Sequence, residues 1–259
     1  MKRIVVKIGG ALLGQPLEPL FEALATLQQE SEVVLVHGGG PQATAMAKRL
    51  GHSPTIIEGR RVTTDIDLDI VKWMIRGQLN VELVAEASKA GIRSLGLSGA
   101  DAGLIQVSKR GVWTVGTTDV DFGHVGDFQK ADPTVLMALL QAGIMPVICP
   151  PGIDQEGHLY NINADTIALE VASALNANEL LLVTETGAVL NNEMKPLRRL
   201  SYQQTQAGVE EGWIASGMKV KTDIGFAALE RGISSVWILG PESVASRIRG
   251  TQLLGAHHA

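Results

Sequence analysis

Short apolar runs alternate with longer segments of helical periodicity along almost the whole chain. The apolar runs are rich in Val, Ile and Leu and show no polar alternation, which is typical of a parallel sheet covered on both faces. They predict strands over 3–8, 33–36, 93–97, 144–148, 179–183 and 234–238. The periodic segments predict helices over 17–29, 41–51, 65–76, 79–90, 133–142, 164–176, 201–211 and 217–231. We therefore expect an α/β fold, a three-layer α/β/α sandwich with a mostly parallel central sheet.

The pattern changes between residues 103 and 128. Short apolar stretches broken by glycines predict a β-rich insertion, with strands over 104–109, 112–115 and 122–128. Residues 154–157 have the composition of a hairpin turn. We expect two lobes, residues 1–176 and 177–259, divided where one helix ends and a new strand begins. The last residues, 256–259, are expected to be a frayed tail.

Composition narrows the class of protein. The chain has 259 residues, 45% of them hydrophobic and 19% charged, which is ordinary for a soluble globular protein. A net charge of −5 argues against general nucleic-acid binding, which needs a basic face. The single cysteine, Cys149, excludes a disulfide framework and a cysteine-rich metal site. Because neither a membrane-spanning run nor a signal-peptide stretch occurs, we expect a cytoplasmic protein.

Two of the predicted strands run directly into glycines. Gly9 and Gly10 follow the first strand, and Gly38, Gly39 and Gly40 follow His37 at the end of the second. Glycine lets backbone N–H groups approach an anion, and a following helix adds its positive N-terminal end. Together the two turns favour a polyphosphate site, although each glycine pair alone could serve only a tight strand–helix connection. The motifs of a dinucleotide-binding domain and of a P-loop are absent, and His37 alone is more typical of a structural imidazole.

Lysines in unusual places supply candidate cationic groups. Lys7 lies within an apolar strand, where its charge costs desolvation unless it is paired or the strand lies at an edge. Its position next to Gly9 and Gly10 favours a phosphate contact. Lys219 and Lys221 lie in the first turn of a helix for which Ser216 is a candidate N-cap, and there they oppose the helix dipole unless an anion binds. The two should face different ways, so we expect only one to reach a site.

Polar residues at three further turns complete the candidate site. Asn163 and Asp165 could simply cap the helix over 164–176, but Asp165 could also hold lysine ammonium groups in place, and Asn161 has no capping role. Arg60 and Arg61 precede a helix capped by Thr63 or Thr64, and an arginine there suits bidentate capture of a carboxylate, although surface arginines are common. The turns at 9–10, 38–40 and 98–101 should meet at the carboxyl edge of the sheet.

Six motifs occur in a fixed order: Val6–Gly10, His37–Pro41, Gly59–Thr63, Gly96–Asp101, Asn161–Asp165 and Gly217–Lys221. In this order they resemble the amino acid kinase family, over essentially the whole chain. The chain is most similar to those members that phosphorylate N-acetyl-L-glutamate in arginine biosynthesis.

The resemblance implies transfer of a phosphoryl group from ATP to the γ-carboxylate of N-acetyl-L-glutamate. It implies that Lys7 and Lys221 contact this group from opposite sides and that Asp165 orients both lysines. Gly9, Gly10, Gly38 and Gly39 would bind phosphate oxygens, and Gly38, Gly39, Arg61 and Asn161 would bind the acyl amino acid. The nucleotide would lie on the C-terminal lobe, with Mg²⁺ held by its phosphates and no protein ligand to the metal.

The sequence departs from the family pattern at several positions. The stretch Thr184–Leu190, beside the expected nucleotide, carries Glu185 where Asp is usual, and Ala100, Ala102 and Val81 replace common Lys, Gly and Lys residues. The acyl group therefore stays open, with N-succinylglutamate and carrier-linked aminoadipate as alternatives. A phosphate-binding regulatory module without catalysis is a further alternative. The chain lacks the N-terminal helical extension of arginine-inhibited hexamers, so the resemblance favours a homodimer without arginine feedback.

Overall fold

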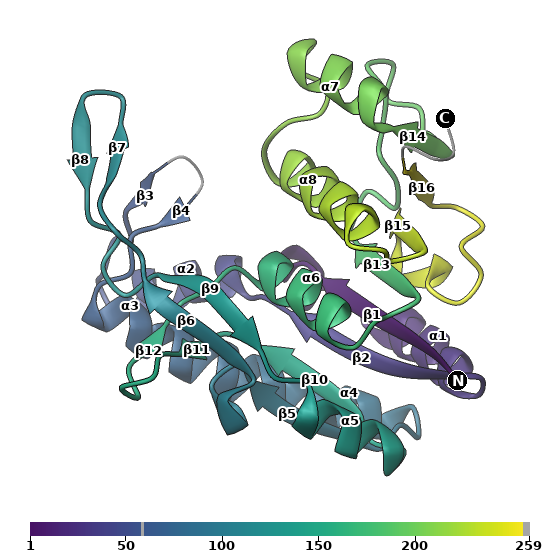
Figure 1. Cartoon of the computed structure of the whole chain (residues 1–259), viewed down its shortest axis with the longest axis horizontal. Coiled ribbons are helices and arrows are strands. Elements are labelled where there is room, and N and C mark those ends of the chain that lie inside the picture. The colour runs from purple at the N-terminus through teal and green to yellow at the C-terminus, as the bar shows by residue number, and fades with distance from the viewer. Residues whose placement is uncertain (58–59, 256–259) are drawn as a thin grey trace.

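The central element is a twisted sheet of eight strands, seen in a computed structural model that describes residues 1–57 and 60–255 (Figure 1). Gly59 of the third motif and the tail 256–259 lie outside the described residues. The strand order is β14-β16-β15-β13-β1-β2-β10-β5. The bounds are β1 (Lys2–Ile8), β2 (Ser31–His37), β5 (Ser94–Ser98), β10 (Met145–Cys149), β13 (Glu179–Val183), β14 (Arg199–Ser201), β15 (Ser235–Leu239) and β16 (Thr251–Leu254). All six predicted strands are confirmed and run parallel, while β16 pairs antiparallel with β15.

Helices cover both faces of this sheet, so the predicted three-layer sandwich is confirmed. The α-helices are α1 (Glu18–Gln28), α2 (Gly40–Arg49), α3 (Asp65–Ile70), α4 (Asn80–Lys89), α5 (Thr134–Gln141), α6 (Ala164–Ala174), α7 (Tyr202–Glu210) and α8 (Ser216–Glu230). The predicted break between helices 65–76 and 79–90 is wrong. A π-helical turn, η2 (Val71–Leu79), joins α3 to α4, and the residues at both of its ends keep helical dihedrals. Gly77 is therefore accommodated inside a widened turn and does not end the helix.

Alternation along β1 divides the interior into two cores. Val5 belongs to a core shared with α6 and α8, whereas Ile4, Val6 and Ile8 belong to a core shared with α1 and α4. Successive side chains of a strand point to opposite faces of the sheet. Lys7 therefore faces the same side as Val5, toward the layer that contains α6 and α8.

The β-rich insertion forms a second sheet and a hairpin. The second sheet has the order β12-β11-β6-β9, from β6 (Ile105–Lys109), β9 (Gly126–Ala131), β11 (Gly152–Ile153) and β12 (Leu159–Tyr160). The hairpin β7 (Trp113–Val115)–β8 (Thr118–Val120) stands beside the hairpin β3 (Ile56–Ile57)–β4 (Arg60–Arg61) at the left of Figure 1.

The insertion corrects one prediction and confirms another. The strand predicted over 122–128 begins only at Gly126, because Gly123 adopts a positive φ and its N–H is bonded to the Asp121 carboxylate, so the chain turns there. The predicted turn at 154–157 is confirmed between β11 and β12. Within the described residues, we find no helix with the length and apolar character that crossing a membrane requires.

Candidate active site

The glycine turns lie at one edge of the sheet, as predicted. β1, β2 and β10 are parallel neighbours, so the turns after β1 and β2 leave the sheet on the same side. A Cβ on Gly10 would lie 2.7 Å from Cδ of Pro41, and one on Gly39 would lie 2.6 Å from Cδ1 of Leu79. Close packing therefore requires glycine at these two positions whether or not an anion binds. Gly9 and Gly38 have room for a Cβ, so packing does not explain them.

A buried ion pair lies beside these turns. Lys7 is 4% exposed and Asp165 is 8% exposed, and Nζ of Lys7 lies 2.8 Å from Oδ1 of Asp165. The contact has the distance of an ion pair but not the angles of a hydrogen bond, since Oδ1 has no hydrogen-bond partner among the described residues. Asn163 caps α6 by accepting the N–H of Asp165, which confirms the predicted cap and fixes the start of the helix. The Asp165 side chain is therefore not needed to cap the helix, and it pairs with Lys7 instead.

Lys221 approaches the same pair from α8. Burial lowers the pKa of Lys221, the Asp165 carboxylate opposes that change, and the charge of Lys7 adds to it. The Lys221 ammonium donates a hydrogen bond to the Gly217 carbonyl oxygen, 3.4 Å away. Two lysines from the two ends of the chain are therefore close enough to influence one another across one carboxylate.

Lys219 lies apart from this group. Its ammonium pairs with Asp223, 2.7 Å away, and both side chains are about half exposed. The prediction that the two helix lysines face different ways is confirmed, and Lys221 is the one that lies near Lys7 and Asp165. The predicted cap is wrong, because the N-cap of α8 is Ala215, without a side-chain hydrogen bond, and Ser216 is the first helical residue with a φ of 46°.

Arg61 is held between α2 and α3. Its guanidinium donates to Oδ1 of Asp67 at 3.2 Å and to Oγ1 of Thr44 at 2.5 Å. Thr64 is the N-cap of α3 and forms a capping box with Asp67, so Thr64 rather than Thr63 has the predicted role. Burial raises the pKa of Asp67, but hydrogen bonds from Thr64, His52 and Arg61 outweigh burial and hold this pKa below its usual value. Asp67 thus stays charged and anchors Arg61.

Asn161 is brought to the Arg61 segment by Thr63. Nδ2 of Asn161 donates to Oγ1 of Thr63 at 3.2 Å, and the backbone of Asn161 pairs with His124 and Gly126. Thr63 therefore contacts both Asn161 and Arg61, since its hydroxyl accepts from Asn161 and donates to the Arg61 carbonyl oxygen. Arg60 points elsewhere, since its guanidinium lies 4.7 Å from the ring centre of Trp113.

A buried polar cluster at this edge was missed by the sequence analysis. Asn80, at the first position of α4, is fully buried and its Nδ2 lies 2.9 Å from Nε2 of His37. Burial lowers the pKa of His37 to about 4, and the charges of Arg76 and Lys7 act in the same direction. His37 is thus a buried, hydrogen-bonded imidazole, which agrees with the structural role that the sequence favours. Asn80 gave no signal in the sequence because neither its type nor its spacing predicts a contact with β2.

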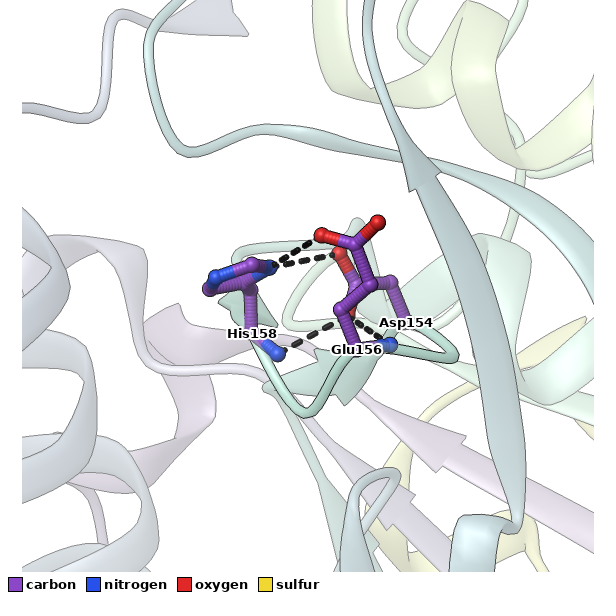
Figure 2. A group of neighbouring side chains, drawn as sticks. All are labelled: Asp154, Glu156 and His158. Carbon is purple, nitrogen blue, oxygen red and sulfur yellow. Dashed lines mark hydrogen bonds and ion pairs between the residues drawn. The ribbon is translucent and has the colours of Figure 1, made fainter.

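Outside this region, Asp154, Glu156 and His158 gather on the β11–β12 turn (Figure 2). Nδ1 of His158 lies 3.1 Å from Asp154 and 3.5 Å from Glu156. Oδ1 of Asp154 also accepts the backbone N–H groups of Glu156 and His158, so the carboxylate closes the turn. The closeness of these three side chains is therefore explained by the hairpin turn that carries them.

The fold and this edge define an α/β protein whose glycine turns and buried lysines suit an anion, and sequence comparison identifies its family. The model described as the amino acid kinase family matches residues 2–240. The chain belongs to the amino acid kinase family, which confirms the resemblance.

Named relatives and a solved structure agree with this membership. The chain is 35% identical to the acetylglutamate kinase of Synechococcus sp. (strain RCC307), over 98% of this chain and 88% of that protein. It is 38% identical to the acetylglutamate kinase of Carboxydothermus hydrogenoformans, over 92% and 84% of the two chains. The crystal structure of smu.665 from Streptococcus mutans UA159 superimposes with a TM-score of 0.83 at 26% identity, covering 97% of this chain and 98% of that one.

Proposed function

We propose that this chain transfers the γ-phosphoryl group of ATP to the γ-carboxylate of N-acetyl-L-glutamate, a step of arginine biosynthesis. Relatives named acetylglutamate kinase, 35% and 38% identical over more than nine-tenths of the chain, support this substrate. The observation that carries the proposal is the buried Lys7–Asp165 pair, with Lys221 close enough that both charges act on its pKa.

The proposed reaction needs no general base. The acceptor is a carboxylate with an ordinary pKa of about 4.3, so it is ionised near neutral pH. One carboxylate oxygen forms a bond to the γ-phosphorus while the bond from that phosphorus to the bridging oxygen breaks, and the electron pair leaves with ADP. No proton moves. The barrier comes from bringing two anions together, so catalysis consists of positioning and charge stabilisation.

The two lysines supply the positive charge. Lys7, Asp165 and Lys221 together carry a net charge of one positive unit when all three are ionised. A phosphoryl group between the two ammonium groups would match that charge and relieve the cost that burial imposes on Lys221. Asp165 orients the ammonium groups, and the N–H groups of Gly9, Gly10, Gly38 and Gly39 bind phosphate oxygens.

Arg61 and Asn161 bind the part of the substrate that does not react. Asp67 and Thr44 occupy two of the guanidinium nitrogens of Arg61, so the side chain is held in place while further N–H groups remain to capture the α-carboxylate. Gly38, Gly39 and Asn161 hold the remainder of the acyl amino acid. Preorganisation by Asp67 reduces the entropy lost when the substrate binds.

ATP and Mg²⁺ are the cofactors of the proposed reaction. The two buried carboxylates of the site are paired with cations, Asp165 with Lys7 and Asp67 with Arg61, so the donor set suits a metal held by phosphate oxygens rather than by the protein. Bound Mg²⁺ would neutralise charge on the β- and γ-phosphates. The nucleotide lies on the C-terminal lobe, residues 177–259, and the acyl amino acid on the lobe of residues 1–176. We also propose a cytoplasmic homodimer.

Trapping of the acyl phosphate tests this function. The purified chain is incubated with MgATP, hydroxylamine and, in turn, N-acetyl-L-glutamate, N-succinyl-L-glutamate, N-acetyl-L-aminoadipate and L-glutamate, and the hydroxamate is measured. We expect the highest kcat/KM with N-acetyl-L-glutamate. A higher kcat/KM with the succinyl or aminoadipyl compound would show that this compound, and not N-acetyl-L-glutamate, is the substrate. If none of the four compounds gives a hydroxamate, the result favours the alternative of a phosphate-binding module without catalysis.

A further inference from the structure

His37 links the glycine turn to the body of the fold. His37 is the last residue of β2, and Gly38 follows it directly. Nδ1 of His37 lies 2.8 Å from the carbonyl oxygen of Gly38, which can only accept a hydrogen bond, so Nδ1 carries the ring proton. Because burial holds the pKa of His37 at about 4, the ring is neutral near pH 7 and Nε2 is left as an acceptor.

Asn80 provides the matching donor, and its own orientation is fixed. Nδ2 of Asn80 lies 2.9 Å from Nε2 of His37 and 2.9 Å from the Val147 carbonyl oxygen, two acceptors that require the NH₂ group. Oδ1 accepts from Arg76 at 3.2 Å. With the amide reversed, two acceptors would face Oδ1 and two donors would face each other. The amide orientation of Asn80 and the tautomer of His37 therefore determine one another.

The surroundings are shaped to hold this amide. A Cβ on Gly96 would collide with Oδ1 of Asn80, so only glycine at that position of β5 admits the side chain. Arg76 also donates to the Gly96 carbonyl oxygen at 3.3 Å, and its Nε lies 3.5 Å from Oδ2 of Asp101. The connection thus runs from the end of β5 through Arg76 and Asn80 to the end of β2.

The π-helical turn brings the same helix against the next glycine. The side chains of Leu79 and Ile75, both in η2, occupy the space that a Cβ on Gly39 would need. A π-helical turn contains an extra residue and so changes which side chains of the following helix face the sheet. Leu79 contacts Gly39 while Asn80, the next residue, contacts His37.

We propose that Asn80 is a positioning residue for the phosphate-binding turn, acting through the tautomer of His37 on the Gly38–Gly39 peptide. In a planar trans peptide, the Gly38 carbonyl and the Gly39 N–H point in opposite directions. Tying the carbonyl to Nδ1–H of His37 therefore turns the Gly39 N–H away from the imidazole, toward the edge where the glycine turns meet. This inference rests on the proposed phosphoryl transfer.

The test combines nitrogen-15 NMR of the histidine rings with kinetics on Asn80→Ala. In the wild type we expect a neutral Nδ1–H form of His37 near pH 7. In Asn80→Ala only the Gly38 carbonyl still selects this form, so we expect its population to fall and the Nε2 resonance to move as its donor is lost. The Gly38 and Gly39 amide resonances should shift, and kcat per folded molecule should fall about 10- to 100-fold, because the Gly39 N–H would be misplaced by a fraction of an ångström. KM for ATP should stay within about threefold, whereas KM for N-acetyl-L-glutamate, which Gly38 and Gly39 also bind in the proposed reaction, should rise.

Two further variants keep the test decisive. Thr205→Val removes another buried hydroxyl, bonded to Ser201 within the α7 region, and should change neither the His37 spectrum nor kcat. Should Asn80→Ala fail to fold, Asn80→Asp keeps the size of the side chain and replaces the donor by an acceptor, so His37 must place a proton on Nε2.

A wild-type His37 in the Nε2–H form overturns the inference. So does an Asn80 variant that folds and keeps either the wild-type ring spectrum or the wild-type kcat. Failure of the wild type to phosphorylate N-acetyl-L-glutamate is a separate result, which counts against the proposed function. In that case the ring and glycine resonances alone decide whether Asn80 positions the turn.

Discussion

Nζ of Lys7 and Oδ1 of Asp165 lie 2.8 Å apart, although one residue belongs to the first strand and the other to the start of α6. Burying either charge alone would cost several kcal/mol, so each makes the other tolerable inside the protein. A buried pair of this kind adds little stability compared with apolar residues. Its value lies in the position that it gives to an ammonium group next to Gly9 and Gly10.

The first prediction concerns the lysines. Lys7→Ala and Lys221→Ala should each lower kcat by on the order of 10²–10³, the scale of losing one donor to a transition-state charge. Lys219→Ala is the matched control, because Lys219 lies on the same helix as Lys221 but pairs with Asp223 on the outside. Steady-state kinetics of the three variants provide the measurement. A near-normal kcat for Lys7→Ala or Lys221→Ala would remove that residue from the reaction.

The second prediction separates two roles of Asp165. Asp165→Asn should lose most activity and still fold, because Asn163, not Asp165, provides the helix cap, and an amide oxygen can still face Lys7. Circular dichroism and urea unfolding report the fold, and hydroxamate formation reports the activity. A variant that unfolds would show that the fold itself needs the Asp165 carboxylate, either for Lys7 or for the start of α6, and would contradict a purely catalytic role.

The third prediction concerns substrate binding. Arg61→Ala should raise KM for N-acetyl-L-glutamate and change kcat less, since Arg61 is proposed to hold a carboxylate that does not react. Arg60→Ala serves as the control, because the Arg60 guanidinium lies over Trp113 and not beside Asp67. Initial rates at varied substrate concentration decide the matter. An unchanged KM in Arg61→Ala would place the α-carboxylate elsewhere.

The fourth prediction is a pH dependence of stability. The pKa of His37 is about 4 in the folded protein and 6.5 in the unfolded chain. The unfolded state therefore takes up a proton first as the pH falls, so this contribution is fully present above pH 6.5 and is lost toward pH 4. Between about pH 7.5 and about pH 4.5 the free energy of unfolding should fall by about 2 to 3 kcal/mol through His37.

Urea unfolding of the wild type and of His37→Gln at the two pH values measures this contribution. The variant has no imidazole at this position, so the difference between the two pH dependences isolates His37. Equal pH dependences in the two proteins would show that the ring titrates normally in the folded state.

Much of the fold could be predicted because it depends on local pattern. The parallel strands are apolar runs, and the alternation around Val5 and Val6 already places Lys7 on one face of the sheet. The pairing of Asp165 with Lys7 is expected from the family resemblance alone, because no local pattern places the start of α6 beside β1. Lys221 could be separated from Lys219 because neighbouring helical positions face different ways.

Other features depend on contacts that no local pattern encodes. Gly77 and Gln78 predict the end of a helix. The helix instead continues through a π-helical turn, in which Ile75 and Leu79 pack against Gly39. The tautomer of His37 depends on Asn80 and Val147, which are distant in the sequence. The anchoring of Arg61 by Asp67 and Thr44 likewise needs the relative placement of α2 and α3.

The most direct measurement is a crystal structure with MgADP, tetrafluoroaluminate and N-acetyl-L-glutamate, in which the fluoroaluminate takes the place of the migrating phosphoryl group. The account predicts that the ammonium groups of Lys7 and Lys221 both lie within about 3 Å of the fluoride ligands, on opposite sides, with Asp165 between them. A complex in which either ammonium group points away from the fluoroaluminate would contradict it.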